Sequence, residues 1–368
     1  MSTKKGRILT GHRPTGARHI GHLMGTLENW ARLQDSYECF FLVADLHVLT
    51  TDYEHPQRVR ENSLGIVLDW LAAGIDPDRS TLVLQSAAPA HTQLNTLLGM
   101  LTTVARLQRV PTYKEQVQAL NLQPSLGLLG YPVLQAADIL IYKANSVPVG
   151  EDQLPHIELT RELARRFNQL YGETFPEPEG LLSATPRLPG TDNRTMHTSY
   201  GNTIFLRDTA EETARKVMSM YTDPTRLRAT DPGHVEGNPV FAYHDIFNQN
   251  KDEVADLKAR YVVGKVGDVE VKKKLVVAIN EYLAPLRARR ESFANRPDDV
   301  IDILRDGTAR AQALTGETLA EVQQKMGLAT NDILSGIQQA AAVPTTGGRK
   351  PGSGGETSYP PRNLLYVP

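Results

Sequence analysis

Hydrophobic residues in the first half of the chain follow two alternating patterns. Three short, mostly apolar runs occupy residues 8–10, 40–44 and 81–85. Such runs are typical of strands buried on both faces of a sheet. Between them, over 23–33 and 64–73, apolar residues recur at helical spacing. This order predicts an α/β fold with a Rossmann-like, doubly wound parallel sheet. Ligands bind such sheets at the carboxyl ends of the strands. Residues 12–22 and residues 45–47 directly follow two of the predicted strands.

The pattern changes along the second half of the chain. Residues 92–120 have helical spacing, 134–142 are apolar, and 147–150 lead into a helix predicted over 154–170. After about residue 210, the segments 216–221, 254–261, 272–286 and 314–326 all have helical spacing. We therefore predict a Rossmann-like domain over 1–207, an all-helical domain over 208–330 and a flexible tail over 331–368. The tail is rich in Pro, Gly, Ser and Thr and has no period.

Composition narrows the class of protein. Of 368 residues, 40% are hydrophobic and 22% charged, which is typical of a soluble globular protein. The net charge of -2 disfavours non-specific nucleic-acid binding by the whole surface. Residues 258–290 hold nine Lys/Arg and three Asp/Glu, a local excess of six positive charges. That excess indicates either a surface facing a polyanion or a solvated helix face.

Two absences in the sequence also narrow the class. With no long apolar stretch and no signal-peptide pattern, we expect a cytoplasmic protein without a membrane partner. The single cysteine, Cys39, excludes an internal disulfide and a multi-thiolate metal site. It lies in an apolar run, so we expect a buried, inert thiol.

The segment His19-Ile20-Gly21-His22 is the first candidate site. It follows the turn at 14–16 and begins a predicted helix, so its two histidines share a helix face. Free backbone N–H groups at a helix N-terminus, together with two imidazoles, suit an anionic ligand such as a nucleotide phosphate. The alternative is a helix start with two partly buried histidines. Gly16 and Gly21 allow close backbone approach to a ligand. We favour the nucleotide site because the four positions of the segment stand next to a predicted strand, turn and helix.

Two further segments carry candidate chemistry. In the segment 147–153, Gly150 could approach a ribose, Asp152 could accept hydrogen bonds from the ribose hydroxyls, and Gln153 could reach a neighbouring substrate. The alternative is that Asp152 only caps the following helix. Asp138 lies among alanines and branched apolar residues. Because an unpaired buried carboxylate is costly, Asp138 needs a donor, either from within the chain or from a ligand N–H.

From about residue 7 to 328, the chain resembles the class I aminoacyl-tRNA synthetases, and specifically the bacterial tryptophan enzymes. The resemblance rests on residues 14–16, 19–22, 45–47, 85–86, 113–115, 136–139, 149–153 and 156–161. The last two segments are the most specific and favour tryptophan over tyrosine. Arg13 stands where most bacterial members carry Gln, which resembles a divergent second-copy subfamily.

The resemblance implies a function and its partners. It implies activation of L-tryptophan with ATP and Mg²⁺ to tryptophanyl-adenylate, followed by transfer to tRNA(Trp). It also implies a homodimer whose helical domain, over 208–330, binds the tRNA anticodon. Under this interpretation the Rossmann-like domain is catalytic.

The same resemblance assigns residues to the site, with no metal ligand among them. The implied catalytic residues are His19, His22, Lys114 and Arg194. The implied ATP-binding residues are Arg13, Pro14, Thr15, Gly21, His22, Gly150, Glu151, Asp152, Leu188, Thr195, Met196, His197, Thr198 and Ser199. The implied tryptophan-binding residues are His47, Tyr131, Gln135, Asp138 and Gln153.

One segment departs from the family. The second signature loop reads Lys-Met-Ser-Lys-Ser in the family, but here 195–199 read Thr-Met-His-Thr-Ser, so both lysines are absent. Losing an electrostatic stabiliser of this kind typically costs ~10²–10³ in rate. Arg194, His197 and Lys114 are the candidate replacements. We favour a working synthetase over two alternatives: a paralogue that binds ATP and tryptophan but charges tRNA poorly, and a small-molecule nucleotidyltransferase.

Overall fold

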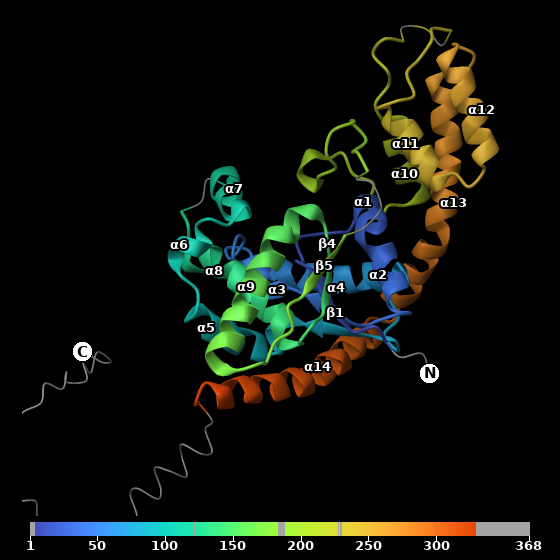
Figure 1. The fold of residues 1–368 in the computed structure, drawn as a ribbon. Helices are drawn as coiled ribbons and strands as arrows, with labels where there is room; N and C mark the ends of the chain where they lie inside the picture. The colour runs from blue at the N-terminus through green and yellow to red at the C-terminus, as the bar shows by residue number, and fades with distance from the viewer. Residues whose placement is uncertain (1–3, 121–122, 183–187, 227, 229, 329–368) are drawn as a thin grey trace, which may run out of the picture.

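A five-stranded parallel sheet forms the centre of the molecule (Figure 1). The computed structural model describes residues 4–120, 123–182, 188–226, 228 and 230–328. The strands are β1 (Arg7–His12), β2 (Glu38–Val43), β3 (Ser80–Leu84), β4 (Ser146–Val149) and β5 (Glu179–Leu182). They lie in the order β3-β2-β1-β4-β5, and every pair is parallel. The predicted doubly wound parallel sheet is confirmed.

Alternate residues of the strands enter two separate cores. Along β2, Cys39 and Phe41 belong to one core, whereas Phe40 and Leu42 belong to the other. This follows from the period of two in a strand, which sends successive side chains to opposite faces. Burial raises the pKa of the Cys39 thiol to about 11, which agrees with the predicted buried, inert thiol.

Helices cover both faces of the sheet. The first face packs against α2 (Glu28–Leu33) and α4 (Pro56–Ala72), and the second packs against α5 (Ala90–Gly99), α8 (Leu126–Ile141) and α9 (Leu154–Tyr171). Short elements lie near the strand ends: α1 (Ile20–His22), the π-helix η1 (Leu23–Leu27), α3 (Asp45–Leu49), and the 3-10 turns η2 (Gln85–Ala87), η3 (Glu151–Gln153) and η4 (Thr198–Tyr200). The helical pattern over 92–120 resolves into α5, α6 (Val104–Leu107) and α7 (Pro111–Leu120).

The C-terminal part of the described chain is helical, as expected. It comprises α10 (Ala210–Met218), α11 (Pro239–Phe247), α12 (Lys251–Val262), α13 (Asp268–Ala294) and α14 (Pro297–Lys325). In Figure 1, α10–α13 stand beyond one end of the sheet and α14 runs back along its lower side. None of the helices in the described ranges is long and apolar enough to cross a membrane. The predicted tail lies outside the described residues.

Helix α14 covers the free edge of β3. Thr308 accepts a hydrogen bond from the backbone N–H of Leu84 through its Oγ1 (3.0 Å). A Cβ added to Gly307 would clash with the backbone oxygen of Leu82, so only glycine allows this approach. The contact satisfies an edge strand that would otherwise expose unpaired backbone groups.

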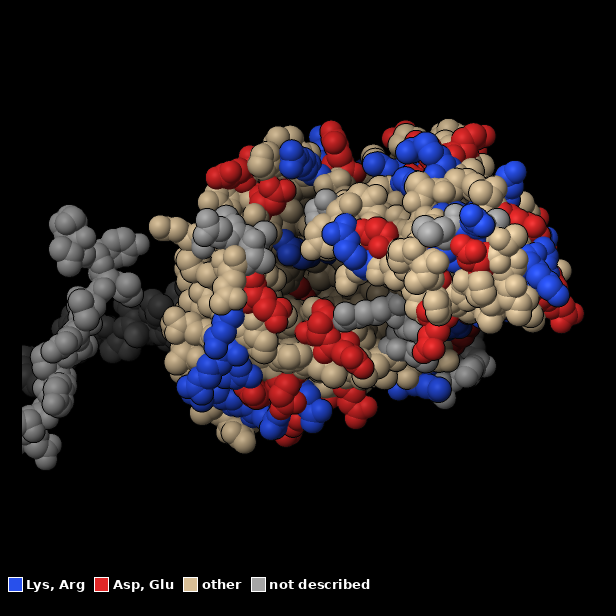
Figure 2. Space-filling model, turned by 90° about the horizontal axis from the view of Figure 1, so that it is seen from above, with Lys and Arg blue, Asp and Glu red and all other residues tan. Residues whose placement is uncertain are grey.

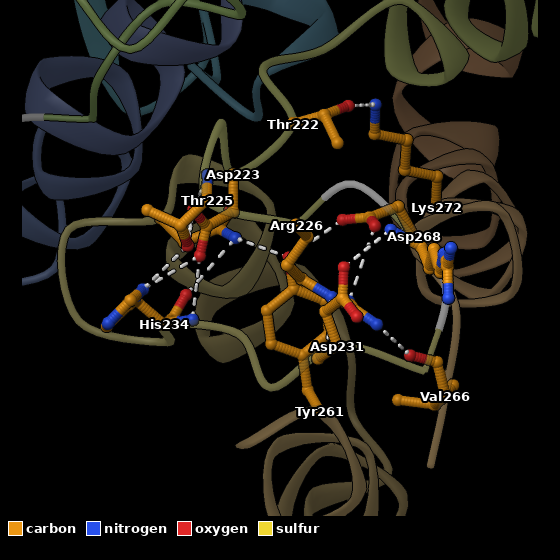
Figure 3. Close-up of polar contacts among 12 residues, drawn as sticks. Thr222, Asp223, Thr225, Arg226, Asp231, His234, Tyr261, Val266, Asp268 and Lys272 are labelled. Carbon is orange, nitrogen blue, oxygen red and sulfur yellow. Dashed lines mark hydrogen bonds and ion pairs between the residues drawn. The ribbon is translucent and has the colours of Figure 1, made fainter. Parts of the chain in front are cut away.

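A polar network fixes the segment between α10 and α11 to α12 and α13 (Figure 3). The guanidinium carbon of Arg226 lies 4.1 Å from the centre of the Tyr261 ring, and its Nη2 donates to the Val266 carbonyl (2.8 Å). The buried Lys272 Nζ donates to Thr222 Oγ1 (2.8 Å). These contacts give a loop without regular secondary structure a defined position.

The hairpin 189–202, which carries the signature segment 195–199, is tied to this helical region. The backbone N–H of Tyr221 donates to the Thr191 carbonyl (2.7 Å), and the Tyr243 hydroxyl donates to the Pro189 carbonyl (2.8 Å). The helical region therefore helps to position the hairpin at the sheet's carboxyl end.

Candidate functional site

A cavity of about 500 Å³ lies at the carboxyl ends of β1, β2 and β4. Seen from above, the surface is hollowed there, and acidic and basic side chains are mixed around the hollow (Figure 2). We distinguish two parts. The histidine half contains Arg13, Arg18, His19 and His22, and the Asp138 half contains His47, Gln85, His91, Tyr131 and Asp138.

The two histidines of the first motif lie together at the helix start, as predicted. Their ring centres are 3.8 Å apart. The backbone N–H of His19 donates to His22 Nδ1 (3.3 Å), so His22 carries its proton on Nε2. His22 also lines the cavity. It can therefore donate a hydrogen bond to an anion.

Both histidines are neutral near pH 7. Burial, reinforced by the Arg18 charge, lowers the pKa of His19 to about 4. The same causes lower the pKa of His22 well below its ordinary value. The pair therefore acts through N–H donors and adds no charge of its own.

The signature segment lies directly on this motif. A Cβ on Gly21 would come within 2.9 Å of Met196 Sδ, so glycine allows the two segments to pack closely. Asn202 links the parts of the hairpin, because its Nδ2 donates to the Thr195 carbonyl (3.0 Å) and to Asp192 (2.8 Å). The two predicted ATP motifs are thus adjacent.

Arg194, a candidate replacement for the missing lysines, is already paired. Its Nε donates to Asp192 Oδ2 (2.7 Å) and its Nη2 lies 2.5 Å from the same oxygen. Its guanidinium also lies 5.5 Å from the Tyr200 ring centre. The Arg194 side chain is 68% exposed and does not line the cavity.

Asp138 is held by three donors from the chain itself. His47 Nε2 lies 2.9 Å from Oδ2, His91 Nδ1 lies 2.7 Å from Oδ1, and Gln85 Nε2 donates to both oxygens at 2.8 Å. Burial disfavours the charged carboxylate, but the hydrogen bonds from His47 and His91 outweigh it and lower the pKa of Asp138. The internal-donor alternative is thus correct for this state, and an indole N–H partner stays a prediction.

Tyr131, Gln135 and Gln153 line the cavity beside Asp138. The Tyr131 hydroxyl lies 2.6 Å from Thr112 Oγ1, and Gln135 Nε2 donates to Gln153 Oε1 (3.4 Å). All five residues predicted to bind tryptophan therefore border one cavity.

Asp152 does not cap the helix that follows it. Helix α9 has Gln153 at its N-cap and no side-chain cap, so the capping interpretation is wrong. Asp152 instead accepts from Gln153 Nε2 (2.9 Å) and borders the cavity. Its neighbour Gly150 lies at the end of β4, where a Cβ would come within 2.8 Å of the Asp152 carboxylate.

The remaining predicted residues are not among those that line the cavity. They are Pro14, Thr15, Gly21, Gly150, Glu151, Leu188 and 195–198, together with His19, Lys114 and Arg194. Lys114 is exposed on α7, two residues after the cavity residue Thr112. The assigned roles of all these residues stay predictions.

Several cavity residues were not assigned from sequence. His12, Trp30, Thr112 and His156 all line the cavity. His12 ends β1, the strand whose end was expected to bind ligand, and its ring stacks on Trp30 at 4.5 Å. Its position at the end of β1 could have identified His12 from the sequence. The other residues come from helices whose orientation only tertiary packing decides.

Comparison with known proteins identifies the family. The family model "tRNA synthetases class I (W and Y)" matches residues 1–284. A tryptophan–tRNA ligase of Treponema pallidum is 52% identical over 336 residues, covering 89% of this chain and 98% of the relative. The relative from Thermotoga maritima is 47% identical over 325 residues, covering 88% and 99%.

Solved structures give the same result. The structure of tryptophanyl-tRNA synthetase from Campylobacter jejuni, complexed with ADP and tryptophan, matches with a TM-score of 0.81 at 32% identity. The match covers 88% of this chain and 100% of that chain. With the family model matching well over half of the sequence, this chain belongs to the class I tRNA synthetases of the tryptophan and tyrosine type.

Proposed function

We propose that this chain is a tryptophan–tRNA ligase that activates L-tryptophan with ATP and transfers it to tRNA(Trp). The observation that carries the proposal is the single cavity that joins the Asp138 half to the histidine half. A carboxylate-centred pocket beside a phosphate-type donor cluster brings an amino acid and a nucleotide together. The relatives that cover most of the chain carry the same name, which disfavours a small-molecule nucleotidyltransferase.

The proposed first step is an in-line displacement. A carboxylate oxygen of tryptophan forms a bond to the α-phosphorus of ATP. The bond from that phosphorus to the bridging oxygen breaks, and its electron pair leaves with pyrophosphate. His22 is placed to donate its Nε2–H to a phosphate oxygen as charge builds up there, because a fixed neutral donor stabilises such charge without reorganising. In the second step, a terminal ribose hydroxyl of the tRNA attacks the acyl carbon and AMP leaves.

Indole recognition falls to the Asp138 half in this proposal. Asp138 has both oxygens fixed by His47, His91 and Gln85, so its position is set before any ligand arrives. To accept from an indole N–H, one of these donors shifts or shares its oxygen. A buried polar partner of this kind discriminates strongly against ligands that lack the donor.

Mg²⁺ enters this proposal with the nucleotide. No group of three or more His, Cys, Asp or Glu side chains able to hold a metal occurs within the described part of the chain. We therefore write the substrate as ATP–Mg²⁺ and assign no protein ligand to the ion.

The wider assignments belong to the same proposal. We propose that 208–330 bind the tRNA anticodon, that two copies form a homodimer, that the enzyme works in the cytoplasm and that it belongs to a second-copy subfamily. The exposed Val104 and Leu126 lie on α6 and α8, and the exposed Met100 directly follows α5; they support the proposal of an interface formed by these residues.

The test is tryptophan-dependent exchange of labelled pyrophosphate into ATP, followed by charging of tRNA(Trp). We expect both activities from the purified chain with ATP–Mg²⁺. Absence of exchange would overturn the ligase assignment. Exchange without charging would instead support the paralogue, whose basis is the loss of both signature lysines.

A further inference from the structure

Two arginines of the histidine half have unusual surroundings. Arg18 is 5% exposed, and its Nε is buried without a hydrogen-bond partner in the described chain. Arg13 lines the cavity, and its Nε is likewise buried without a partner. Neither guanidinium forms an ion pair with a carboxylate of the described residues. Buried cations without an anion are costly, so these positions need an explanation.

Arg18 holds the turn that carries Arg13. Its Nη2 donates to the Gly16 carbonyl (2.8 Å) and, more weakly, to the Arg13 carbonyl (3.4 Å). The nearest acidic group, Asp69, accepts from the Arg18 backbone N–H (3.0 Å) and is already paired with Arg290 Nε (2.7 Å). Asp69 attracts the Arg18 charge and raises its pKa against the effect of burial, but it forms no direct ion pair with the guanidinium among the described contacts.

Arg13 is fixed at one end and open at the other. Its Nη2 donates to Thr51 Oγ1, a neutral partner. The carboxylate that influences it, Asp52, is paired with His55 Nδ1 at 2.7 Å. Burial lowers the pKa of Arg13, but an arginine stays charged at neutral pH. One edge of its guanidinium is thus available to a ligand in the cavity.

In the hairpin 189–202, by contrast, the arginine is paired with a carboxylate. Its cation, Arg194, is paired with Asp192 and lies outside the cavity lining. The histidines add no charge, because burial and then Arg18 lower the pKa values of His12, His19 and His22. Among the described residues of the histidine half, the positive charges without a direct ion pair are those of Arg13 and Arg18.

We propose that Arg13 contacts the phosphate oxygens of ATP, while Arg18 acts as a positioning residue that holds the 13–16 turn, so that this pair replaces the charge of the missing signature lysines. The inference rests on the proposed function. A planar guanidinium matches phosphate oxygens and can bind two of them. A phosphate bound in the cavity would also supply the anion that the Arg13 guanidinium lacks.

The experiment compares Arg13→Gln, Arg18→Gln and Arg194→Gln in pyrophosphate exchange by the full chain. We expect Arg13→Gln to lower kcat/KM for ATP by ~10²-fold, within the range seen when a charge stabiliser is lost. Arg18→Gln should lower it less, because Arg18 acts through the turn and does not contact the nucleotide. Arg194→Gln should lose less than either. Arg305→Gln, a 67% exposed arginine on α14, is the matched control. A loss in Arg194→Gln that equals or exceeds that of Arg13→Gln would overturn the proposal.

Two further measurements separate charge from folding. Arg18→Lys keeps the charge, so we expect it to recover most of the activity lost in Arg18→Gln; equal loss in both would contradict the positioning role. The KM for ATP should rise more than the KM for tryptophan in Arg13→Gln, because Arg13 touches the Asp138 half only through its electrostatic effect on Tyr131. A parallel rise in the KM for both substrates would count against the proposal.

Direct binding distinguishes this inference from the proposed function. ATP–Mg²⁺ is titrated calorimetrically into the wild type, Arg13→Gln and Arg194→Gln. Weaker binding in Arg13→Gln alone supports the phosphate contact even if the wild type shows no exchange, which would overturn only the ligase assignment. Equal ATP affinity in wild type and Arg13→Gln overturns the inference, whatever the exchange activity.

Discussion

The two halves of the cavity satisfy their polar groups in different ways. In the Asp138 half, both carboxylate oxygens are paired with three donors from the chain itself. In the histidine half, buried nitrogen atoms of Arg13, Arg18 and His19 have no partner within the described structure. The first half is organised before a ligand binds, whereas the second is arranged to receive an anion.

This difference explains where the chain tolerates change. A closed network such as that of Asp138 leaves its partners unpaired if one member is lost, and unpaired buried polar groups are costly. An open cluster of fixed charges can instead share its task among several residues. The signature segment that lacks both lysines packs against the open half, where we propose that Arg13 and Arg18 compensate for them.

The largest expected effect comes from removing the carboxylate at the centre of the Asp138 half. Asp138→Ala removes the acceptor of His47, His91 and Gln85, so we expect kcat/KM for tryptophan to fall by on the order of 10⁴-fold. Asp138→Asn keeps one acceptor oxygen and should lose less. Exchange kinetics at varied tryptophan measure both variants. Unchanged tryptophan binding in Asp138→Ala would show that the indole partner lies elsewhere.

Acid should destabilise the protein mainly through the histidine half. The pKa of His19 is lowered to about 4 from 6.5, so the folded state favours the neutral ring. Its contribution is complete above pH 6.5 and is lost as the pH falls towards 4. We expect a loss on the order of 3 kcal/mol from this residue. His12 and His22 have pKa values shifted in the same direction and add to the loss.

Denaturant unfolding at pH 7.5 and pH 5 checks this expectation. His19→Gln should reduce the pH dependence of the free energy of unfolding, because the glutamine does not titrate. His156→Gln is the matched change beside Tyr131 of the Asp138 half, because burial lowers the pKa of His156 to about 4 as well. A larger reduction in His156→Gln than in His19→Gln would reverse the assignment of acid sensitivity to the histidine half.

A smaller effect should follow from weakening the contact between α14 and β3, the strand that precedes Gln85 of the Asp138 half. Gln85 directly follows β3, whose free edge is covered by α14. Gly307→Ala would force a methyl group onto the Leu82 carbonyl, so we expect a loss of about 2 kcal/mol in stability and a raised KM for tryptophan but not for ATP.

The same helix offers a control for this change. Gly316 has open space around its Cβ position, so Gly316→Ala should stabilise the helix by about 0.5–1 kcal/mol. Thermal unfolding of both variants provides the comparison. If both glycines tolerate alanine equally, α14 does not hold β3 as tightly as the contact indicates.

The smallest effect should come from returning a lysine to the signature segment. Thr198→Lys alone should change the exchange rate less than about threefold if Arg13 already supplies the charge. In the Arg13→Gln background, the same lysine should restore about tenfold, since two residues that serve one task are not additive. A large gain from Thr198→Lys in the wild type would mean that the charge is still limiting.

Much of the architecture was predictable because it depends on local patterns. The apolar runs around Ile8, Phe41 and Leu82 predicted parallel strands, and the helical spacing of the C-terminal part predicted helices. The histidine motif and Asp138 were also recognisable, because two imidazoles at a helix start and a carboxylate in an apolar segment are unusual. The breaks between α5, α6 and α7 were not predicted, since short helices depend on tertiary packing.

What the sequence determined by itself was the order of elements, the chemistry of each candidate residue and the absence of the signature lysines. Only the tertiary structure decided which donors meet Asp138, that Asp192 neutralises Arg194, and that Arg13 and Arg18 lack a carboxylate partner. The reason is physical. Local spacing sets secondary structure, but pairing between charges depends on distances of a few ångströms between residues that are far apart in the chain.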